Sequence, residues 1–236
     1  MKIALIGYGK MGRAIEKIAL SRGHEIVAII NSKNQEGFES DEFKSADVAI
    51  EFSSPTTAYN NFLNCFKYNI PVIAGSTGWL DKLEDIKGVC NNGGGTILYS
   101  SNFSIGVNIF FQLNKYLAKI MDSFKEYNVS MNEIHHIHKL DHPSGTAITL
   151  AEGIIDNIER VNSWSETSAD GALLISNERV GEVPGTHQIC YKSEVDVINI
   201  EHRALNREGF ALGAVVAAEW LKGRKGFFTM DDMLSF

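Results

Sequence analysis

The stretch that decides the fold is Ile3-Ala4-Leu5-Ile6-Gly7-Tyr8-Gly9-Lys10-Met11-Gly12, where an apolar run passes directly into a glycine loop. The loop has the spacing G-x-G-x-x-G, a weak signal alone, but here it follows a predicted strand and opens a predicted helix. In that context Gly7 allows a tight turn, Gly9 lets the backbone approach a pyrophosphate, and Gly12 allows close packing of helix on strand. Because a helix N-terminus attracts phosphates, the stretch predicts a dinucleotide-binding β–α unit; a glycine turn without a ligand is the alternative.

The first hundred residues repeat this alternation of a short apolar run and a longer mixed segment. The runs are rich in Val and Ile and are bounded by Gly, Asn, Ser or Pro, as buried parallel strands are. They cover Ile3–Ile6, Ile26–Ile30, Val48–Phe52, Val72–Ala74 and Thr96–Tyr99, and the helical segments cover Arg13–Leu20, Thr57–Tyr68 and Leu80–Ile86. The alternation predicts an α/β fold, a Rossmann-type doubly wound parallel sheet with helices on both faces.

The pattern changes after about Ser104 to one typical of an α+β domain. Two helices are expected, at Val107–Phe124 and Thr146–Arg160, with a strand at Tyr127–Ile134 and three antiparallel strands at Leu173–Ile175, Gln188–Tyr191 and Val195–Ile200. A last apolar helix, Phe210–Leu221, is expected to return to the first domain. We therefore predict a dinucleotide-binding domain of residues 1–104 plus 209–236, and a second α+β domain of residues 105–208.

Composition excludes several classes of protein. The chain has 236 residues, 44% hydrophobic and 22% charged, with a net charge of 22 − 29 = −7. These values are typical of a globular chain with a sizeable core, and the acidic balance argues against nucleic acid as a partner. The cysteines Cys65, Cys90 and Cys190 form no CxxC pair, and the apolar N-terminal run is too short for a signal peptide or a membrane span. We expect a reduced, cytoplasmic protein without a membrane partner.

A second stretch is rich in ionisable side chains that could take part in catalysis or binding: Glu133-Ile134-His135-His136-Ile137-His138-Lys139-Leu140-Asp141-His142-Pro143-Ser144-Gly145-Thr146. Four of the seven histidines of the chain lie within eight of these residues. A polar surface loop is one interpretation. A metal site built from the four histidines and Asp141 is another, although the spacing is not a standard zinc pattern and Lys139 would repel a cation.

The third interpretation is a general acid beside an anion-binding pocket. Histidine titrates near 6.5, so it exchanges a proton near neutral pH, and Lys139 supplies a fixed positive charge. The segment Pro143–Thr146 opens the predicted helix, with Ser144 or Thr146 as its cap, and the free N–H groups there attract anions. These features predict a small substrate that carries carboxylates, bound in a local positive site of an acidic protein.

The choice of nicotinamide cofactor depends on the end of the second strand, Ile30-Asn31-Ser32-Lys33. An Asp or Glu usually stands there and bonds the ribose 2′-hydroxyl of NAD, and this chain lacks it. Asn31 can bond a hydroxyl without repelling a 2′-phosphate, and Lys33 can pair with that phosphate. The sequence therefore favours NADP or no strong preference, unless Lys33 is only a solvated loop lysine.

Together these motifs resemble the dihydrodipicolinate reductase family, the 4-hydroxy-tetrahydrodipicolinate reductases. The histidine stretch, extended to Ala147, resembles the signature of that family. Further segments agree in order: Glu51-Phe52-Ser53-x-Pro55, Ala74-Gly75-Ser76-Thr77-Gly78, Ser100-Ser101-Asn102-Phe103-Ser104-x-Gly106-Val107-Asn108, Arg179-Val180-Gly181-x-x-Pro184-Gly185-x-His187 and Gly226-Phe227-Phe228-Thr229-Met230-x-Asp232. The resemblance covers nearly the whole chain.

The resemblance implies reduction of 4-hydroxy-tetrahydrodipicolinate by NADPH or NADH, with loss of water, in the diaminopimelate route to lysine. It implies a homotetramer whose second domain binds substrate and forms the oligomer. His135 would be the general acid and Lys139 its assistant, no metal would take part, and the substrate carboxylates would bind His136, Gly145 and Thr146. The implied cofactor-binding residues are Gly7, Tyr8, Gly9, Lys10, Met11, Gly12, Asn31, Lys33, Gly75, Ser76, Thr77, Ser100, Ser101, Asn102 and Phe103.

Two departures from the family pattern matter: the missing acid at Asn31, and a region 162–177 that looks shorter than in longer members. Two alternatives remain. A dinucleotide-sensing regulatory protein would explain the glycine loop but not the histidine stretch. A related reductase of the aspartate-semialdehyde type would need a nucleophilic cysteine, and none of the three lies in a fitting segment.

Overall fold

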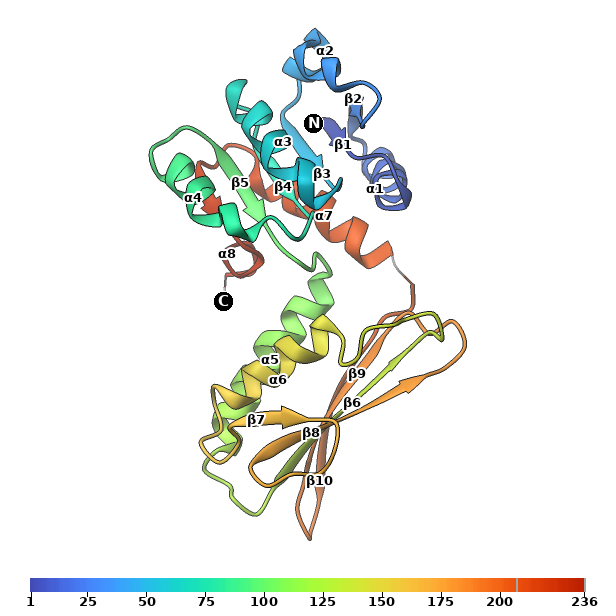
Figure 1. Cartoon of the computed structure of the whole chain (residues 1–236), viewed down its shortest axis with the longest axis vertical. Helices are drawn as coiled ribbons and strands as arrows, with labels where there is room; N and C mark the ends of the chain where they lie inside the picture. Colours follow the sequence, from blue (N-terminus) through green and yellow to red (C-terminus); the bar gives the residue numbers. More distant parts are fainter. Residues whose placement is uncertain (207, 236) are drawn as a thin grey trace. The chain divides into compact units, whose positions relative to one another are not determined.

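The computed structural model describes residues 1–206 and 208–235. Contacts divide the chain into two compact units, one formed by Met1–Ile105 with Glu208–Phe236 and the other by Gly106–Arg207 (Figure 1). The first unit is therefore built from both ends of the chain. Among the described residues, no helix combines the length and the apolar character that crossing a membrane requires.

The first unit contains one sheet of six parallel strands in the order β11-β5-β4-β3-β1-β2. The strands are β1 (Lys2–Ile6), β2 (Glu25–Ile30), β3 (Val48–Glu51), β4 (Val72–Ala74), β5 (Thr96–Tyr99) and β11 (Gly226–Phe228). The helices and 3₁₀ turns are α1 (Lys10–Ser21), η1 (Gln35–Glu39), α2 (Asp41–Lys44), α3 (Pro55–Lys67), η2 (Leu80–Lys82), α4 (Leu83–Asn91), α7 (Glu208–Leu221) and α8 (Met230–Leu234). The five parallel strands predicted from apolar runs are confirmed.

Both faces of this sheet are covered, because successive side chains of a strand point to opposite faces. Ile3 and Leu5 of β1 pack in one core with α1 and α7. Ala4 and Ile6 pack in a second core with α2, α3 and α4. The Rossmann-type doubly wound prediction is confirmed.

The second unit has a mixed sheet of five strands in the order β10-β9-β6-β8-β7. Its strands are β6 (Asn128–His135), β7 (Ser163–Ser165), β8 (Ala172–Arg179), β9 (Thr186–Lys192) and β10 (Val197–Arg203), and its helices are α5 (Ile105–Met121) and α6 (Gly145–Ile155). The two helices run side by side and pack with the sheet in a single core (Figure 1). The α+β prediction for this part of the chain is confirmed.

In the second unit, the direction of one strand and the end of one helix differ from the prediction. The strand containing Leu173–Ile175 pairs parallel, not antiparallel, with β6, because α6 and β7 make a crossover connection before it. Helix α6 ends at Ile155, five residues before the predicted end at Arg160. The Asn157 side chain donates to the Gly153 carbonyl at 2.9 Å, satisfying a carbonyl at the helix end.

Candidate active site

The glycine loop of the first unit joins β1 to α1. Gly7 has φ +90°, and a Cβ on it would lie 2.0 Å from the Phe52 carbonyl oxygen. A Cβ on Gly12 would lie 2.3 Å from the Gly7 carbonyl oxygen. The space beside Gly9, the N-cap of α1, is open to 4 Å. Gly7 and Gly12 are therefore required by the packing of the chain itself, and Gly9 leaves room for another molecule at the helix N-terminus.

A cleft of about 290 Å³ opens at the carboxyl ends of β1, β2 and β3. Ligands of open α/β sheets bind at this edge. Residues on its wall are Ile6, Gly7, Gly9, Ile30, Asn31, Ser32, Gln35, Phe52, Ser53, Ser54, Thr57 and Asn61. Ser53, Thr57 and Asn61 were not among the expected cofactor residues. Ser53 directly follows the predicted strand Val48–Phe52, whereas Thr57 and Asn61 lie on α3 and reach the cleft only through the fold.

The other expected loop residues make contacts within the chain. The Tyr8 hydroxyl donates to Glu16, and its ring lies 5.4 Å from the Arg13 guanidinium carbon. Met11 packs against the core, and Lys10 is exposed. Only Gly7 and Gly9 of this loop line the cleft.

At the rim of the cleft, the Asn31 side chain already has a partner. Its Oδ1 accepts from the backbone N–H of Lys33 at 2.9 Å. The Gln35 side-chain amide donates to the backbone carbonyl of Asn31 at 2.8 Å. The Lys33 side chain is exposed. Of these three residues, Lys33 contributes the positive charge near the rim.

Glu51, at the end of β3, is fully buried and organises the far wall of the cleft. One of its carboxyl oxygens, Oε1, accepts from the Ser53 backbone N–H at 3.1 Å and from the Ser76 hydroxyl at 3.0 Å. Burial raises the pKa of Glu51. Gly75 lies against the ring of Phe52, which a Cβ there would approach to 2.1 Å.

The expected segment 100–103 is fixed by local hydrogen bonds, and Thr77 and Ser101 are exposed. The Ser100 hydroxyl donates to the Asn102 carbonyl at 2.7 Å, and Phe103 is buried with its ring centroid 5.8 Å from that of Phe52. The structure thus brings this segment beside the third-strand end.

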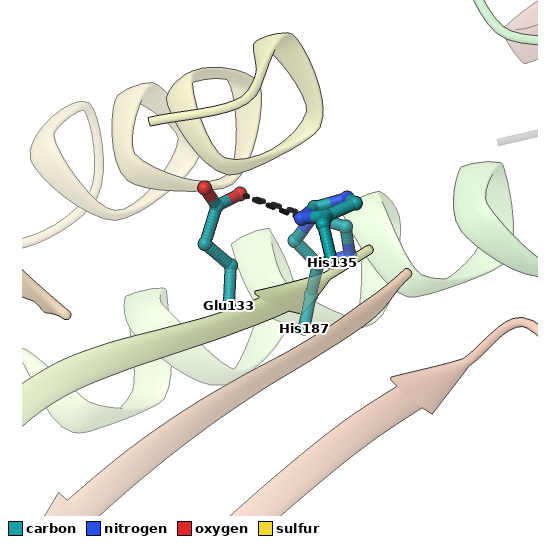
Figure 2. Close-up of side chains that lie close together, drawn as sticks. All are labelled: Glu133, His135 and His187. Carbon is teal, nitrogen blue, oxygen red and sulfur yellow. Dashed lines mark ion pairs between the residues drawn. The ribbon is translucent and has the colours of Figure 1, made fainter. Parts of the chain in front are cut away.

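In the second unit, three side chains from two strands converge (Figure 2). Glu133 and His135 alternate along β6 and share a face, and the register of β9 pairs His187 with Glu133. Glu133 Oε2 lies 3.6 Å from His135 Nδ1 and 3.6 Å from His187 Nε2. All three residues are buried, and the two imidazole rings meet edge to face with centroids 5.1 Å apart.

Ser144 connects this cluster to α6. Its hydroxyl accepts from the Ala147 backbone N–H at 3.2 Å, so it is the N-cap, one of the two predicted candidates. The Ser144 backbone N–H donates to both oxygens of Glu133, at 3.1 and 3.2 Å. The Ser144 hydroxyl also lies 3.2 Å from His187 Nε2. One residue therefore caps the helix and orients both partners of His135.

The charge states in the cluster follow from these contacts. Burial opposes ionisation of Glu133, but contacts from His187 and Ser144 outweigh it and lower the pKa of Glu133 to about 2. Burial lowers the pKa of His135 to about 4, although Glu133 acts in the opposite direction. At neutral pH the site without substrate contains an ionised carboxylate and a neutral His135.

The other predicted residues lie around this centre. Lys139 Nζ donates to both oxygens of Asp141, at 2.8 and 2.7 Å, so its charge is paired within the chain. Gly145 and Thr146 form the first turn of α6, where Gly145 is exposed with open space around it. His136 is half-buried. The lysine of the expected anion clamp is thus already paired within the chain.

The histidines of the stretch do not assemble into the metal site considered from the sequence. His138 pairs with Glu182 at 3.3 Å, and His142 pairs with Glu166 at 2.7 Å. Within the described chain, the group with possible metal-ligand atoms near one another is Glu133, His135 and His187. The backbone N–H of Ser144 already occupies the Glu133 oxygens, so the geometry favours proton chemistry.

Comparison with known proteins gives concordant matches. The family model described as dihydrodipicolinate reductase, N-terminus, matches residues 1–103, and that described as dihydrodipicolinate reductase, C-terminus, matches residues 106–234. A 4-hydroxy-tetrahydrodipicolinate reductase of Christiangramia forsetii is 48% identical over 100% of this chain and 98% of its own length. A 4-hydroxy-tetrahydrodipicolinate reductase of Archaeoglobus fulgidus is 33% identical over 99% of this chain and 100% of its own length.

Among solved structures, a dihydrodipicolinate reductase from Paenisporosarcina sp. TG-14, described as dipicolinate-bound, has a TM-score of 0.80 at 21% identity over 97% of both chains. An engineered D-amino acid dehydrogenase bound to NADP⁺ has a TM-score of 0.56 at 14% identity, over 100% of this chain and 98% of its own. At these identities the structural likeness shows a shared fold.

Proposed function

The chain belongs to the dihydrodipicolinate reductase family, and from this premise we propose which residues carry each step of its reaction. The chain is an oxidoreductase that reduces 4-hydroxy-tetrahydrodipicolinate to tetrahydrodipicolinate with loss of water, using NAD(P)H, in lysine biosynthesis through diaminopimelate. The buried cluster at the end of β6 is the observation that supports these residue roles.

We propose that His135 is the general acid, which protonates the substrate carbon beside the one that receives hydride. Lys139 would assist and hold the substrate, and His136, Gly145 and Thr146 would bind its carboxylates. The supporting observation is that Gly145, the exposed first residue of α6, follows Ser144, whose backbone N–H donates to Glu133 beside His135. The dipicolinate-bound relative supports a dicarboxylate ligand.

The low pKa of His135 has a direct consequence for this role. At pH 7 the imidazole in the free site is neutral, so it carries one N–H proton and lacks the second proton of the imidazolium. A bound dicarboxylate brings negative charge that favours the imidazolium, which raises the pKa towards the working pH. Substrate binding would therefore be coupled to proton uptake, and a substrate carboxylate would replace Asp141 as the partner of Lys139.

The cleft of the first unit fits a dinucleotide, because Gly9 leaves open space at the N-terminus of α1 and the wall is lined by hydroxyl and amide groups. When bound, the cofactor supplies the hydride, and the chain binds and orients the cofactor. We propose that the expected loop residues bind the pyrophosphate. Gly75, Ser76 and Thr77, with 100–103, would frame the nicotinamide side.

For cofactor choice we propose that the chain accepts NADPH or NADH, with Lys33 favouring NADPH. The support is that residues 31–35 contain no acid to repel a 2′-phosphate, while Lys33 is exposed. Measuring kcat/KM with both cofactors tests this. Lys33→Glu should lower kcat/KM for NADPH while leaving that for NADH within about twofold, since a phosphate loses a pairing charge and gains a repelling one. Equal losses for both cofactors would contradict it.

A coupled assay with freshly made 4-hydroxy-tetrahydrodipicolinate tests the catalytic assignment. His135→Gln or Lys139→Ala should remove most of the turnover, while binding of NADPH, measured by fluorescence titration, is retained. If both variants keep wild-type kcat, the assignment is wrong. Cofactor binding without turnover in the wild-type chain would instead support the dinucleotide sensor.

We propose that residues 1–104 plus 209–236 bind the dinucleotide, and that residues 105–208 bind substrate and form a homotetramer in the cytoplasm. The exposed apolar side chains of β10, Val197 and Ile198, support an interface on the second unit. Light scattering after size exclusion should give four times the chain mass of 26.1 kDa, and a monomer would contradict the proposal.

A further inference from the structure

We infer that Glu133 and His187 are positioning residues for His135: the buried carboxylate is the counter-charge of the imidazolium, and His187 with Ser144 fixes that carboxylate in place. The inference deepens the proposed function and rests on the role of His135 as general acid. Neither Glu133 nor His187 was assigned a role from the sequence.

The geometry of the cluster directs the carboxylate of Glu133 at both imidazole rings. A single oxygen, Glu133 Oε2, lies 3.6 Å from a nitrogen of each imidazole, His135 Nδ1 and His187 Nε2. The carboxylate cannot rotate freely, because the Ser144 backbone N–H contacts both of its oxygens and Arg179 Nη2 lies 3.5 Å from Oε1. Glu133 is 0% exposed. The carboxylate is therefore held with one oxygen directed at both rings (Figure 2).

The ring of His135 contains a buried nitrogen atom, Nδ1, without a hydrogen-bond partner among the described residues. A buried polar atom without a partner requires an explanation, and catalytic hydrogen bonds are often long until substrate binds. When His135 gains its proton, Nδ1–H can donate to Glu133 Oε2, because a charge-assisted hydrogen bond shortens this contact. At 3.6 Å from Glu133 Oε2 the atom has no hydrogen bond, and shortening of this contact in the imidazolium supplies one.

The other ring nitrogen of His135 lies beside a glycine. Nε2 of His135 faces Gly185, where a Cβ would lie 3.1 Å from it. Gly185 has φ +156° and is buried, so the absence of a side chain leaves this nitrogen uncrowded. With Nδ1 directed to Glu133, Nε2 is the nitrogen available to deliver the proton.

The charged groups around His135 come from every neighbouring element. Glu133 on β6 favours its charged form, whereas His187 on β9, Lys139 after β6 and Arg179 on β8 oppose it, in addition to burial. His202 on β10 pairs in register with His187. Without Glu133, burial and three neighbours would all act against the imidazolium. The carboxylate is what allows an acid at this buried position.

Replacement of Glu133 by Gln tests the inference, because it removes the charge and keeps the volume. We expect kcat to fall by about 100-fold, the lower end of what general acid catalysis contributes. The alkaline limb of the kcat–pH profile should move to lower pH, since the imidazolium loses its counter-charge, while KM for NADPH stays within twofold. Glu133→Asp should restore part of kcat and of the profile. An unshifted profile, with or without loss of kcat, would overturn the inference.

A matched control is Glu166→Gln, which breaks the exposed His142–Glu166 pair of the same unit at 2.7 Å. It should leave kcat and the pH profile unchanged. If Glu133→Gln fails to fold, the ¹⁵N shifts of His135 in the wild-type chain decide. Added dipicolinate should protonate the ring and place Nδ1–H in a strong hydrogen bond, and a ring that stays neutral or binds through Nε2 alone overturns the inference.

The two proposals fail in different ways. If His135→Gln retains wild-type kcat, the general acid assignment itself is wrong. If His135→Gln is inactive but Glu133→Gln keeps the wild-type pH profile, only the positioning role is wrong. His187→Asn removes one contact of the carboxylate but keeps its charge, so kcat should fall less than in Glu133→Gln, and an unchanged kcat would remove His187 from the positioning role.

Discussion

Acidification should destabilise the second unit through His135. The folded chain has a pKa of about 4 for this side chain, against the usual 6.5. Below pH 6.5 the unfolded chain therefore binds a proton that the folded chain does not, so stability falls as pH falls. Linkage gives a loss of about 2 kcal/mol between pH 8 and pH 5 from this group. His135 is 7% exposed, so solvent screening leaves most of that value.

Hydrogen exchange with mass spectrometry measures this loss for each unit. The free energy of opening for the peptides of β6 and β9 should fall by about 2 kcal/mol more in the wild type than in His135→Gln between these pH values, after correction for intrinsic exchange. Peptides of β1 should show no difference between the two proteins. Below pH 5 a further loss should follow, because Glu133 has a pKa of about 2, below its usual 4.5.

The sign of the effect refutes or supports the reasoning. If the free site contained a protonated His135 paired with Glu133, the pKa would be raised and the wild type would gain stability as pH fell to 5 relative to the variant. That result would contradict the neutral, buried imidazole from which the coupling of substrate binding to proton uptake was argued.

Three further substitutions have distinct expected results. Asp141→Asn frees Lys139 from an ion pair worth about 0.2–1 kcal/mol. The KM for the substrate should therefore fall by up to about fivefold in steady-state assays, and a raised KM would contradict competition between Asp141 and the substrate for Lys139. Gly12→Ala forces a Cβ against a loop carbonyl and should cost about 1–3 kcal/mol in thermal unfolding, whereas Gly9→Ala should leave the Tm unchanged and weaken NADPH binding in titrations. The reverse order would refute the assignment of open space. Ser144→Ala removes the N-cap of α6 and should cost about 1 kcal/mol by thermal unfolding, with an unchanged Tm as the contrary result.

Much of the first unit could be predicted because its strands are continuous apolar runs that end at turn residues. β11 could not, since three residues beginning with glycine become a strand only by pairing with β5. The predicted antiparallel direction of β8 was wrong, because the alternation of residues along a strand does not reveal the path of the connection before it. The short β7 lies in that path and has an exposed pattern that gives no signal.

The candidate site shows the same division between local and distant information. His135 could be found from a cluster of histidines close together in sequence. His187 could not, because it lies far along the chain and meets Glu133 only through the register of two antiparallel strands. The pairing of Lys139 with Asp141 was also not expected, although both stand in the quoted stretch. A motif gives the residue types, whereas the partner of each charge depends on the fold.

The way the first unit draws on both ends of the chain affects the order of folding during synthesis. Helix α7 packs buried residues such as Ala214 and Ala218 against one face of the six-stranded sheet. Five of the six strands of that sheet precede residue 100, and only β11 follows α7. A ribosome must therefore finish the second unit before that face can be fully covered. Domains usually mature in order from the N-terminus, and here the middle of the chain can close its core first. Until then α1 alone covers this face, and the part of β3 that contacts α7 lacks its cover.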